Sequence, residues 1–208
     1  MEFNKVLESR RSIRKYKNTP ISDDDINYIL KNASLSPSAH NKQPWHYFVF
    51  TKQKKDELTT LISDYITNKQ ELTYYEKIMR NCLSFVKEAP VVILVYSTLE
   101  KNELNDYLSL GSSIEHICLS AKNIDIGSLW LGVISDFTEL IKSKYNFQNM
   151  NLISAVVLGY PEEEPIARPR KNVNEIVTFM WLFYIYLIKA FNINLKYSII
   201  NIYVYRRK

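Results

Sequence analysis

Two apolar runs constrain the fold of this 208-residue chain more than any other feature. Residues 91–96 have the sequence VVILVY, and residues 152–158 have the sequence LISAVVL. A strand that is apolar on both sides is typical of a sheet covered on both faces. Amphipathic helices elsewhere in the chain can provide that cover. We therefore predict a layered α/β or α+β fold with three or four strands.

The rest of the pattern predicts helices and two further strands around these runs. Apolar residues at helical spacing indicate helices, two of them begun by the capping residues Ser22 and Ser135, and Tyr107 falls on the apolar face of the longest one. Aromatic and β-branched residues indicate strands. The expected helices are 2–9, 23–33, 53–67, 70–87, 105–123 and 136–144. The expected additional strands are 45–51 and 129–134.

The excess positive charge lies entirely at the C-terminal end. The formal net charge is +5, yet residues 179–208 hold basic side chains and no acidic one, which leaves equal numbers of both in residues 1–178. A neutral body disfavours nucleic-acid binding. We expect one domain over 1–178, followed by a hydrophobic and basic extension over 179–208.

Missing motifs exclude several classes of protein. The four glycines form neither a dinucleotide-binding nor a phosphate-loop motif, and the HExxH and GxSxG motifs do not occur. Cys82 and Cys118 are too few and too far apart to predict a zinc site or a disulfide framework. The N-terminus lacks the apolar core of a secretory signal. We expect a cytoplasmic protein without a metal site, whose chemistry belongs to a bound cofactor.

Two arginine clusters and one loop are the candidates for cofactor binding. Residues 10–14 place three guanidinium groups and the Ser12 hydroxyl close together, and such donors suit a phosphate, although an exposed basic turn is the alternative. Arg168 and Arg170 would face the same side of an extended segment. Residues 36–45 combine small side chains with amides that can pair with the edge of a heterocycle.

These segments resemble the FMN-dependent nitroreductase family. The resemblance is carried by RRSIRKY from residue 10, SPSAHNKQPWHYFVF over 36–50, AP followed by VVILVYS, GSLWLG over 127–132, and LGYPEEEPIARPRK over 158–171. It implies an α+β fold with a mixed sheet flanked by helices. It also implies a homodimer with the helix over 105–123 at the interface and FMN held between the subunits.

The resemblance further assigns roles to single residues. The FMN phosphate and ribityl chain would be held by Arg10, Arg11, Ser12 and Arg14, with Arg168 and Arg170 completing the phosphate site. The flavin ring would be lined from the partner subunit by Pro37, Ser38, Ala39 and Asn41, with Gln43 supporting that loop. The backbone of Leu131 and Gly132 would approach the N5 and O4 edge of the flavin. Arg14 would also stabilise the reduced flavin, and no side chain is implied as catalytic because the reaction occurs at N5.

The implied activity is a ping-pong reduction of small electron-poor acceptors such as nitroaromatics or quinones, with NADH or NADPH as the donor. Two alternatives are a reductase of halogenated aromatics and a flavin-binding protein without turnover. The extension over 179–208 departs from the family, and three interpretations stay open: a non-functional extension, an arm that wraps the partner subunit, and an interfacial membrane anchor. Its longest apolar run, residues 179–188, is well below the ~20 residues that span a bilayer.

Overall fold

The computed structural model describes residues 1–147 and 149–180. Residues Met1–Ile166 form one compact unit, and a second unit begins at Ala167. The second unit contains the short helix α7 (Val173–Ile176), and its residues up to 180 are exposed. The predicted division after residue 178 stays a prediction, because all but the first two residues of the expected extension lie outside the described residues.

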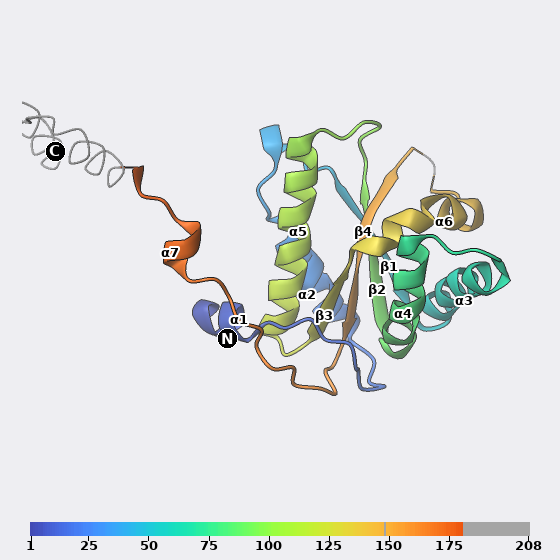
Figure 1. The fold of residues 1–208 in the computed structure, drawn as a ribbon, viewed down its shortest axis with the longest axis horizontal. Coiled ribbons are helices and arrows are strands. Elements are labelled where there is room, and N and C mark those ends of the chain that lie inside the picture. Colours follow the sequence, from blue (N-terminus) through green and yellow to red (C-terminus); the bar gives the residue numbers. More distant parts are fainter. Residues whose placement is uncertain (148, 181–208) are drawn as a thin grey trace, which may run out of the picture. The chain divides into compact units, whose positions relative to one another are not determined.

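The first unit is built on a four-stranded sheet (Figure 1). The strands are β1 (Trp45–Thr51), β2 (Val91–Ser97), β3 (Gly127–Leu131) and β4 (Asn151–Gly159), in the order β1-β2-β4-β3. All three strand pairs are antiparallel, which confirms the α+β class but differs from the expected mixed sheet. Among the described residues, parallel pairing is limited to a single bridge between Ser12 and Ser128, because the segment after α1 meets the edge strand at one point only.

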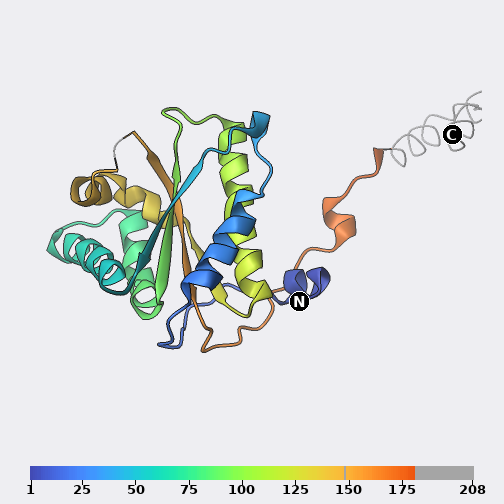
Figure 2. The ribbon, with the colours of Figure 1, turned by 180° about the vertical axis from the view of Figure 1, so that it is seen from behind.

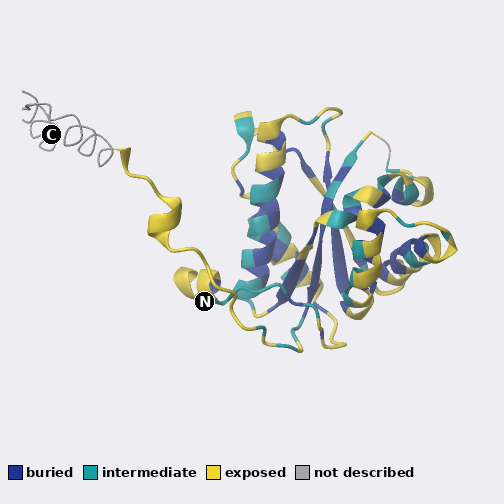
Figure 3. Ribbon diagram, viewed as in Figure 1, coloured by how far each residue is buried: buried dark blue, intermediate teal, exposed yellow. Residues whose placement is uncertain are grey.

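Strand β2 is buried along its whole length, as its apolar sequence predicts (Figure 3). Its side chains alternate between two separate cores, since successive residues of a strand point to opposite faces. The even-numbered residues from Val92 to Tyr96 enter one core, and the odd-numbered residues from Val91 to Val95 enter the other. The sheet is therefore the middle layer of three.

Helices cover both faces of the sheet (Figures 1 and 2). One face is covered by α2 (Asp23–Ser34) and α5 (Leu104–Asn123), whose apolar residues share one core. The other face is covered by α3 (Lys52–Asn68), α4 (Tyr74–Glu88) and α6 (Thr138–Tyr145). The N-terminal helix α1 (Phe3–Ser9) contacts α5 and buries only Val6. In the described part of the chain, no helix has the length and apolarity needed to cross a membrane.

Three sequence predictions about element ends need correction. The helix expected from residue 70 begins at Tyr74, because Thr73 and Glu76 form a capping box. The strand expected through residue 134 ends at Leu131, and Gly132–Phe137 form the 3-10 helix η2. Ser135 does not cap α6, since its hydroxyl donates to the Gly132 carbonyl inside η2 at 3.1 Å.

The long helix α5 also differs from the expectation in one detail. Tyr107 is half exposed, whereas the sequence pattern places it on the buried face. The buried residue at this point is Asp106, which is 1% exposed. A carboxylate takes the core-facing position here because it caps the helix and pairs with a lysine.

Candidate functional site

The predicted phosphate-binding arginines follow α1 on a segment that lies against the edge strand β3. The backbone amide of Ile13 donates to the Ser128 carbonyl at 3.0 Å. This close approach needs a glycine, because a Cβ at Gly127 would lie 2.8 Å from Cγ1 of Ile13. The arginine segment is thus held against the sheet by its backbone at Ile13, and this contact does not use the arginine side chains.

Within the described residues, the guanidinium groups of this segment make a small number of polar contacts. Arg11 donates through Nη1 to the carbonyls of Glu8 and Arg10 at 2.6 and 2.8 Å. Arg14 donates through Nη1 to the Ser12 carbonyl at 3.2 Å, and Arg10 Nε lies 3.7 Å from Glu115 Oε1. A guanidinium has five N–H donors, so these contacts leave donors for an anionic ligand.

Arg10 and Arg11 line a cavity of about 510 Å³. Its other walls include Gly127 and Ser128 of β3 and the acidic loop that follows β4. Within that loop, the Glu163 carboxylate accepts hydrogen bonds from the backbone amides of Arg14 and Lys15. The cavity therefore offers cationic donors beside the Glu163 carboxylate, which already has partners, and beside three further acidic residues, Asp125, Glu162 and Glu164.

The predicted flavin-lining loop, residues 36–44, has an unusual backbone. His40, Asn41 and Gln43 have positive φ values of 52°, 55° and 47°. Left-handed backbone costs about 1–2 kcal/mol for a residue with a side chain, less for asparagine. Residues 37–43 are also at least partly exposed, so burial of their side chains does not explain the conformation. Contacts with other elements must hold this loop.

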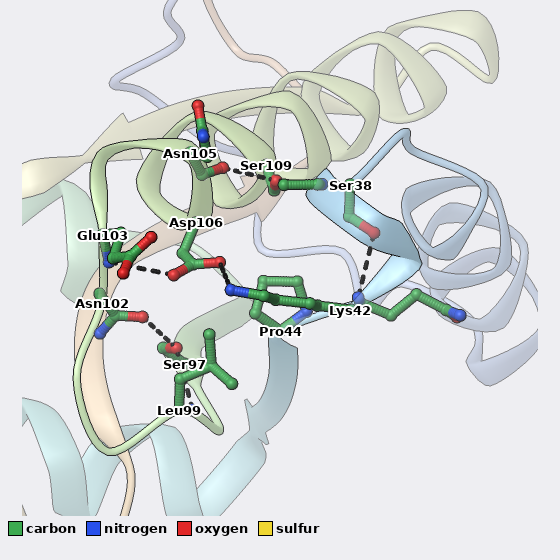
Figure 4. A network of polar contacts seen from close by, with 12 residues as sticks. Ser38, Lys42, Pro44, Ser97, Leu99, Asn102, Glu103, Asn105, Asp106 and Ser109 are labelled. Atoms are coloured by element: carbon green, nitrogen blue, oxygen red, sulfur yellow. Dashed lines mark hydrogen bonds and ion pairs between the residues drawn. The ribbon is translucent and has the colours of Figure 1, made fainter.

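The loop is held by polar contacts to Thr98, the residue that follows β2, and to the first turns of α5, some of which Figure 4 shows. The Ala39 amide donates to Ser109 Oγ at 3.1 Å, and Lys42 Nζ lies 3.1 Å from Asp106 Oδ1. At the end of the loop, the Thr98 amide donates to the Pro44 carbonyl at 2.8 Å. Inside the loop, the Gln43 amide donates to Ser38 Oγ at 3.0 Å. The side chains of Asn41 and Gln43 remain exposed.

The third predicted group is the backbone at Leu131 and Gly132, where β3 passes into η2. Leu131 is buried, but Gly132 is exposed. A Cβ built at Gly132 would meet no atom within 4 Å, so the backbone here is open to a planar ligand. Residues Arg168 and Arg170 are exposed and belong to the second unit, and their place relative to the other groups stays a prediction.

Within one chain, α5 stands between the arginine segment and the loop of residues 36–44. The loop contacts Asp106 and Arg10 contacts Glu115. Nine residues make two and a half helical turns, so these two contacts lie on opposite sides of the helix and about 13 Å apart along its axis. Figures 1 and 2 show the loop (with the 3-10 helix η1, Ala39–Asn41) and α1 at opposite ends of α5.

The sequence pattern alone does not single out Lys42, Asp106 and Ser109. Asp106 and Ser109 are three residues apart on one helix face, a weak sign that both contact the same segment. That this segment is the loop of residues 36–44, more than sixty residues earlier, follows only from the tertiary structure. The pKa of Asp106 is lowered, first by the hydrogen bond from the Glu103 amide and then by Lys42.

Comparison with known proteins agrees with this architecture. A protein of Archaeoglobus fulgidus, provisionally named an NADH dehydrogenase/NAD(P)H nitroreductase, is 33% identical over 78% of this chain and 87% of its own length. Iodotyrosine deiodinase of Thermotoga neapolitana is 26% identical over 81% of this chain and 93% of its own length. The crystal structure of an FMN-dependent nitroreductase of Mycobacterium smegmatis in complex with NADPH superposes with a TM-score of 0.72, at 16% identity, over 85% of this chain and 96% of that one.

The sequence pattern that defines the nitroreductase family matches residues 7–160. This range contains the arginine segment, the loop of residues 36–44 and the junction of β3 with η2. It also contains all four strands of the sheet. The chain therefore belongs to the nitroreductase family.

Proposed function

We propose that this protein is an FMN-dependent oxidoreductase that takes electrons from NADH or NADPH and passes them to small electron-poor acceptors. The observation that carries the proposal is that one unit contains a cavity lined by Arg10 and Arg11, a polar loop with exposed amides and an open backbone at Gly132. These features suit the phosphate, the ring edge and the reactive face of a flavin, respectively. The location that goes with this proposal is the cytoplasm, where Cys82 and Cys118, which are free in this structure, would stay reduced.

In this proposal each group of residues has a separate task. Arg10, Arg11, Ser12 and Arg14 would bind the FMN phosphate and ribityl chain, joined by Arg168 and Arg170. Residues 37–39 together with Asn41 would line the ring, supported by Gln43, and the backbone of Leu131 and Gly132 would face its N5 and O4 edge. Bound FMN would supply the electron-transfer chemistry, so the chain's own part is to bind, to orient and to place positive charge nearby.

A homodimer follows from the same proposal. The loop and the arginine segment lie on opposite sides of α5, so a loop from a second copy would complete the site that Arg10 begins. The outer face of α5 suits this arrangement, because Leu104 and Leu108 are 73% and 61% exposed next to the small residues Gly111 and Ser112. Exposed leucines beside small residues are typical of a helix that packs closely against another chain.

Steady-state kinetics test the reaction itself. With NADPH and a nitroaromatic or quinone varied against each other, a ping-pong enzyme gives parallel lines in double-reciprocal plots. A halogenated aromatic such as an iodinated phenol belongs in the same screen, because the similarity to iodotyrosine deiodinase favours that class as the second candidate. Oxidation of NADH or NADPH that no acceptor accelerates would favour a flavin-binding protein instead.

Arg14→Ala tests the phosphate site. Loss of a charge-assisted contact should weaken FMN binding by at least ~1.5 kcal/mol. Titration of FMN into the apoprotein, followed by flavin fluorescence, measures the change. Lys54→Ala is the control, since Lys54 pairs with Glu57 on the surface of α3. Equal FMN affinity in Arg14→Ala and the wild type would contradict the assignment.

A further inference from the structure

We infer that the ion pair between Lys42 and Asp106 is a clasp that positions the loop of residues 36–44 for the flavin ring. Lys42 and Asp106 are then positioning residues that touch neither cofactor nor substrate. The inference rests on the proposed function, because the loop matters for catalysis only if a flavin binds against it.

Lys42 differs from its two neighbours in the loop in backbone conformation. Lys42 has ordinary right-handed backbone, with φ −64° and ψ −26°, and stands between Asn41 and Gln43, which are both left-handed. Its side chain reaches α5, while the side chains of its two neighbours stay exposed. The two neighbouring amides pair with each other instead, since Gln43 Nε2 donates to Asn41 Oδ1 at 3.2 Å.

Asp106 is held in a fixed position by its own helix. This residue lies in the first turn of α5, and its Oδ2 accepts the Glu103 amide at 3.0 Å. The Asp106 side chain is 1% exposed, and the Lys42 side chain is 39% exposed. The Asp106 carboxylate is therefore held in place by the first turn of α5, and the more exposed Lys42 side chain connects the loop to it.

A second contact, between Ser109 and Ala39, also holds the loop against α5. One turn further along α5, Ser109 Oγ accepts the Ala39 amide while its own hydrogen goes to the Asn105 carbonyl at 2.7 Å. The two contacts reach opposite ends of the 3-10 helix η1, because Ala39 is its first residue and Lys42 follows its last. Figure 4 shows the contact between Lys42 and Asp106, with Ser109 further along α5. Two anchors one turn apart fix the orientation of the loop as well as its position.

The chain contains a matched control for the clasp. Lys69 and Glu76 form an ion pair between the end of α3 and the first turn of α4, with Nζ 2.7 Å from Oε1. The exposures are nearly the same as in the clasp, 35% for the lysine and 7% for the carboxylate. In both pairs the acid also completes a capping box. The two pairs differ in the segment that they hold.

The test compares Lys42→Met, Lys42→Arg and Lys69→Met with the wild type in two measurements. The first is FMN affinity, from fluorescence titration of the apoprotein. Lys42→Met is expected to bind about ten-fold more weakly, as for a loop that adopts the binding conformation about a tenth of the time. Lys42→Arg should stay within about two-fold, because a monodentate ion pair needs only the charge. Lys69→Met should bind FMN as the wild type does.

The second measurement is hydrogen exchange of the apoprotein, which does not depend on flavin. Amides in residues 36–44 should exchange faster in Lys42→Met but not in Lys69→Met. If Lys42→Met does not fold, Asp106→Asn replaces it, since the amide keeps an acceptor for Glu103 and removes the charge.

Three outcomes would overturn the inference, and they are distinguishable from one another. A wild type that binds FMN together with an equally tight Lys42→Met overturns the clasp and leaves the proposed function standing. Equal losses of affinity in Lys42→Met and Lys69→Met would show a general effect of stability rather than positioning. A wild-type chain that binds no FMN overturns the proposed function and the clasp together.

Discussion

Two ion pairs of similar build hold two different segments of this protein. Lys42–Asp106 fastens the loop of residues 36–44 to α5, and Lys69–Glu76 fastens the corner between α3 and α4, residues 69–73. Each joins a partly exposed lysine to a carboxylate in the first turn of a helix. The surroundings differ.

The α3–α4 corner has apolar support behind its ion pair. The Tyr65 hydroxyl donates to Glu76 Oε1 at 3.1 Å, and the Tyr65 ring contacts the buried Phe137 ring edge-on at 5.8 Å. Leu72, inside the corner, packs against the same core. Residues 37–43 of the loop have no buried side chain at all. An ion pair thus adds to a conformation that the core already fixes at the corner, whereas in the loop the conformation depends on the polar contacts.

Phe137→Ala should break the support of the corner and gives the largest effect. The ring is 1% exposed, and removal of such a side chain costs about 3–5 kcal/mol. Urea unfolding at neutral pH measures the loss. Hydrogen exchange of the amides in residues 36–44 should stay near the wild-type rate under native conditions, since this loop is held independently. A small loss of stability together with much faster exchange in residues 36–44 would contradict the distinction between the two segments.

Acid should weaken the corner through Glu76. Its pKa is lowered to about 2, first by the hydrogen bond with Lys69 and then by that with the Thr73 backbone. A lowered pKa in the folded state means that the stability is present above the ordinary value of 4.5 and is lost as pH falls towards 2. The melting temperature of the wild type should exceed that of Glu76→Gln by a few degrees at pH 6. The difference should shrink through this window, and a difference that stays constant down to pH 2 would contradict the account.

Ser109→Ala tests the second anchor of the loop and gives the smallest effect. It removes the acceptor of the Ala39 amide, and the loss of one neutral hydrogen bond, about 1 kcal/mol, should weaken FMN binding about three- to five-fold. Thr59→Ala is the matched control, because Thr59 is also buried and also donates to the carbonyl four residues earlier at 2.7 Å, but it lies on α3, which packs on the other face of the sheet from α5. If both variants bind FMN alike, Ser109 does not position the loop.

The sequence predicts those features that depend on local pattern. The apolar runs at 91–96 and 152–158 correspond to β2 and β4, and the helix over 105–123 corresponds to α5. Ser22 caps α2 as its spacing from Asp25 predicts. The parts that could not be predicted depend on partners far away in the sequence. Burial of Asp106 in place of Tyr107 needs Lys42, and the end of β3 at Leu131 reflects the turn into η2.

The same distinction between local pattern and distant partners applies to the candidate site. Residue types identify the arginine segment and the loop as candidates, because phosphate and heterocycles need donors of known kinds, and the resemblance to the nitroreductase family adds Gly132. Their arrangement around α5 comes only from the fold. The clasp belongs to this second class, since no local pattern connects a lysine at 42 with an aspartate at 106.

The proposed function requires that FMN binds to this chain and is reduced by NADH or NADPH. This can be tested with an anaerobic visible absorption spectrum of the purified protein, supplemented with FMN and recorded before and after addition of each donor. We expect a bound-flavin spectrum that bleaches on addition of at least one of the two donors. A protein that binds no flavin, or a bound flavin that stays oxidised with both donors, would contradict it.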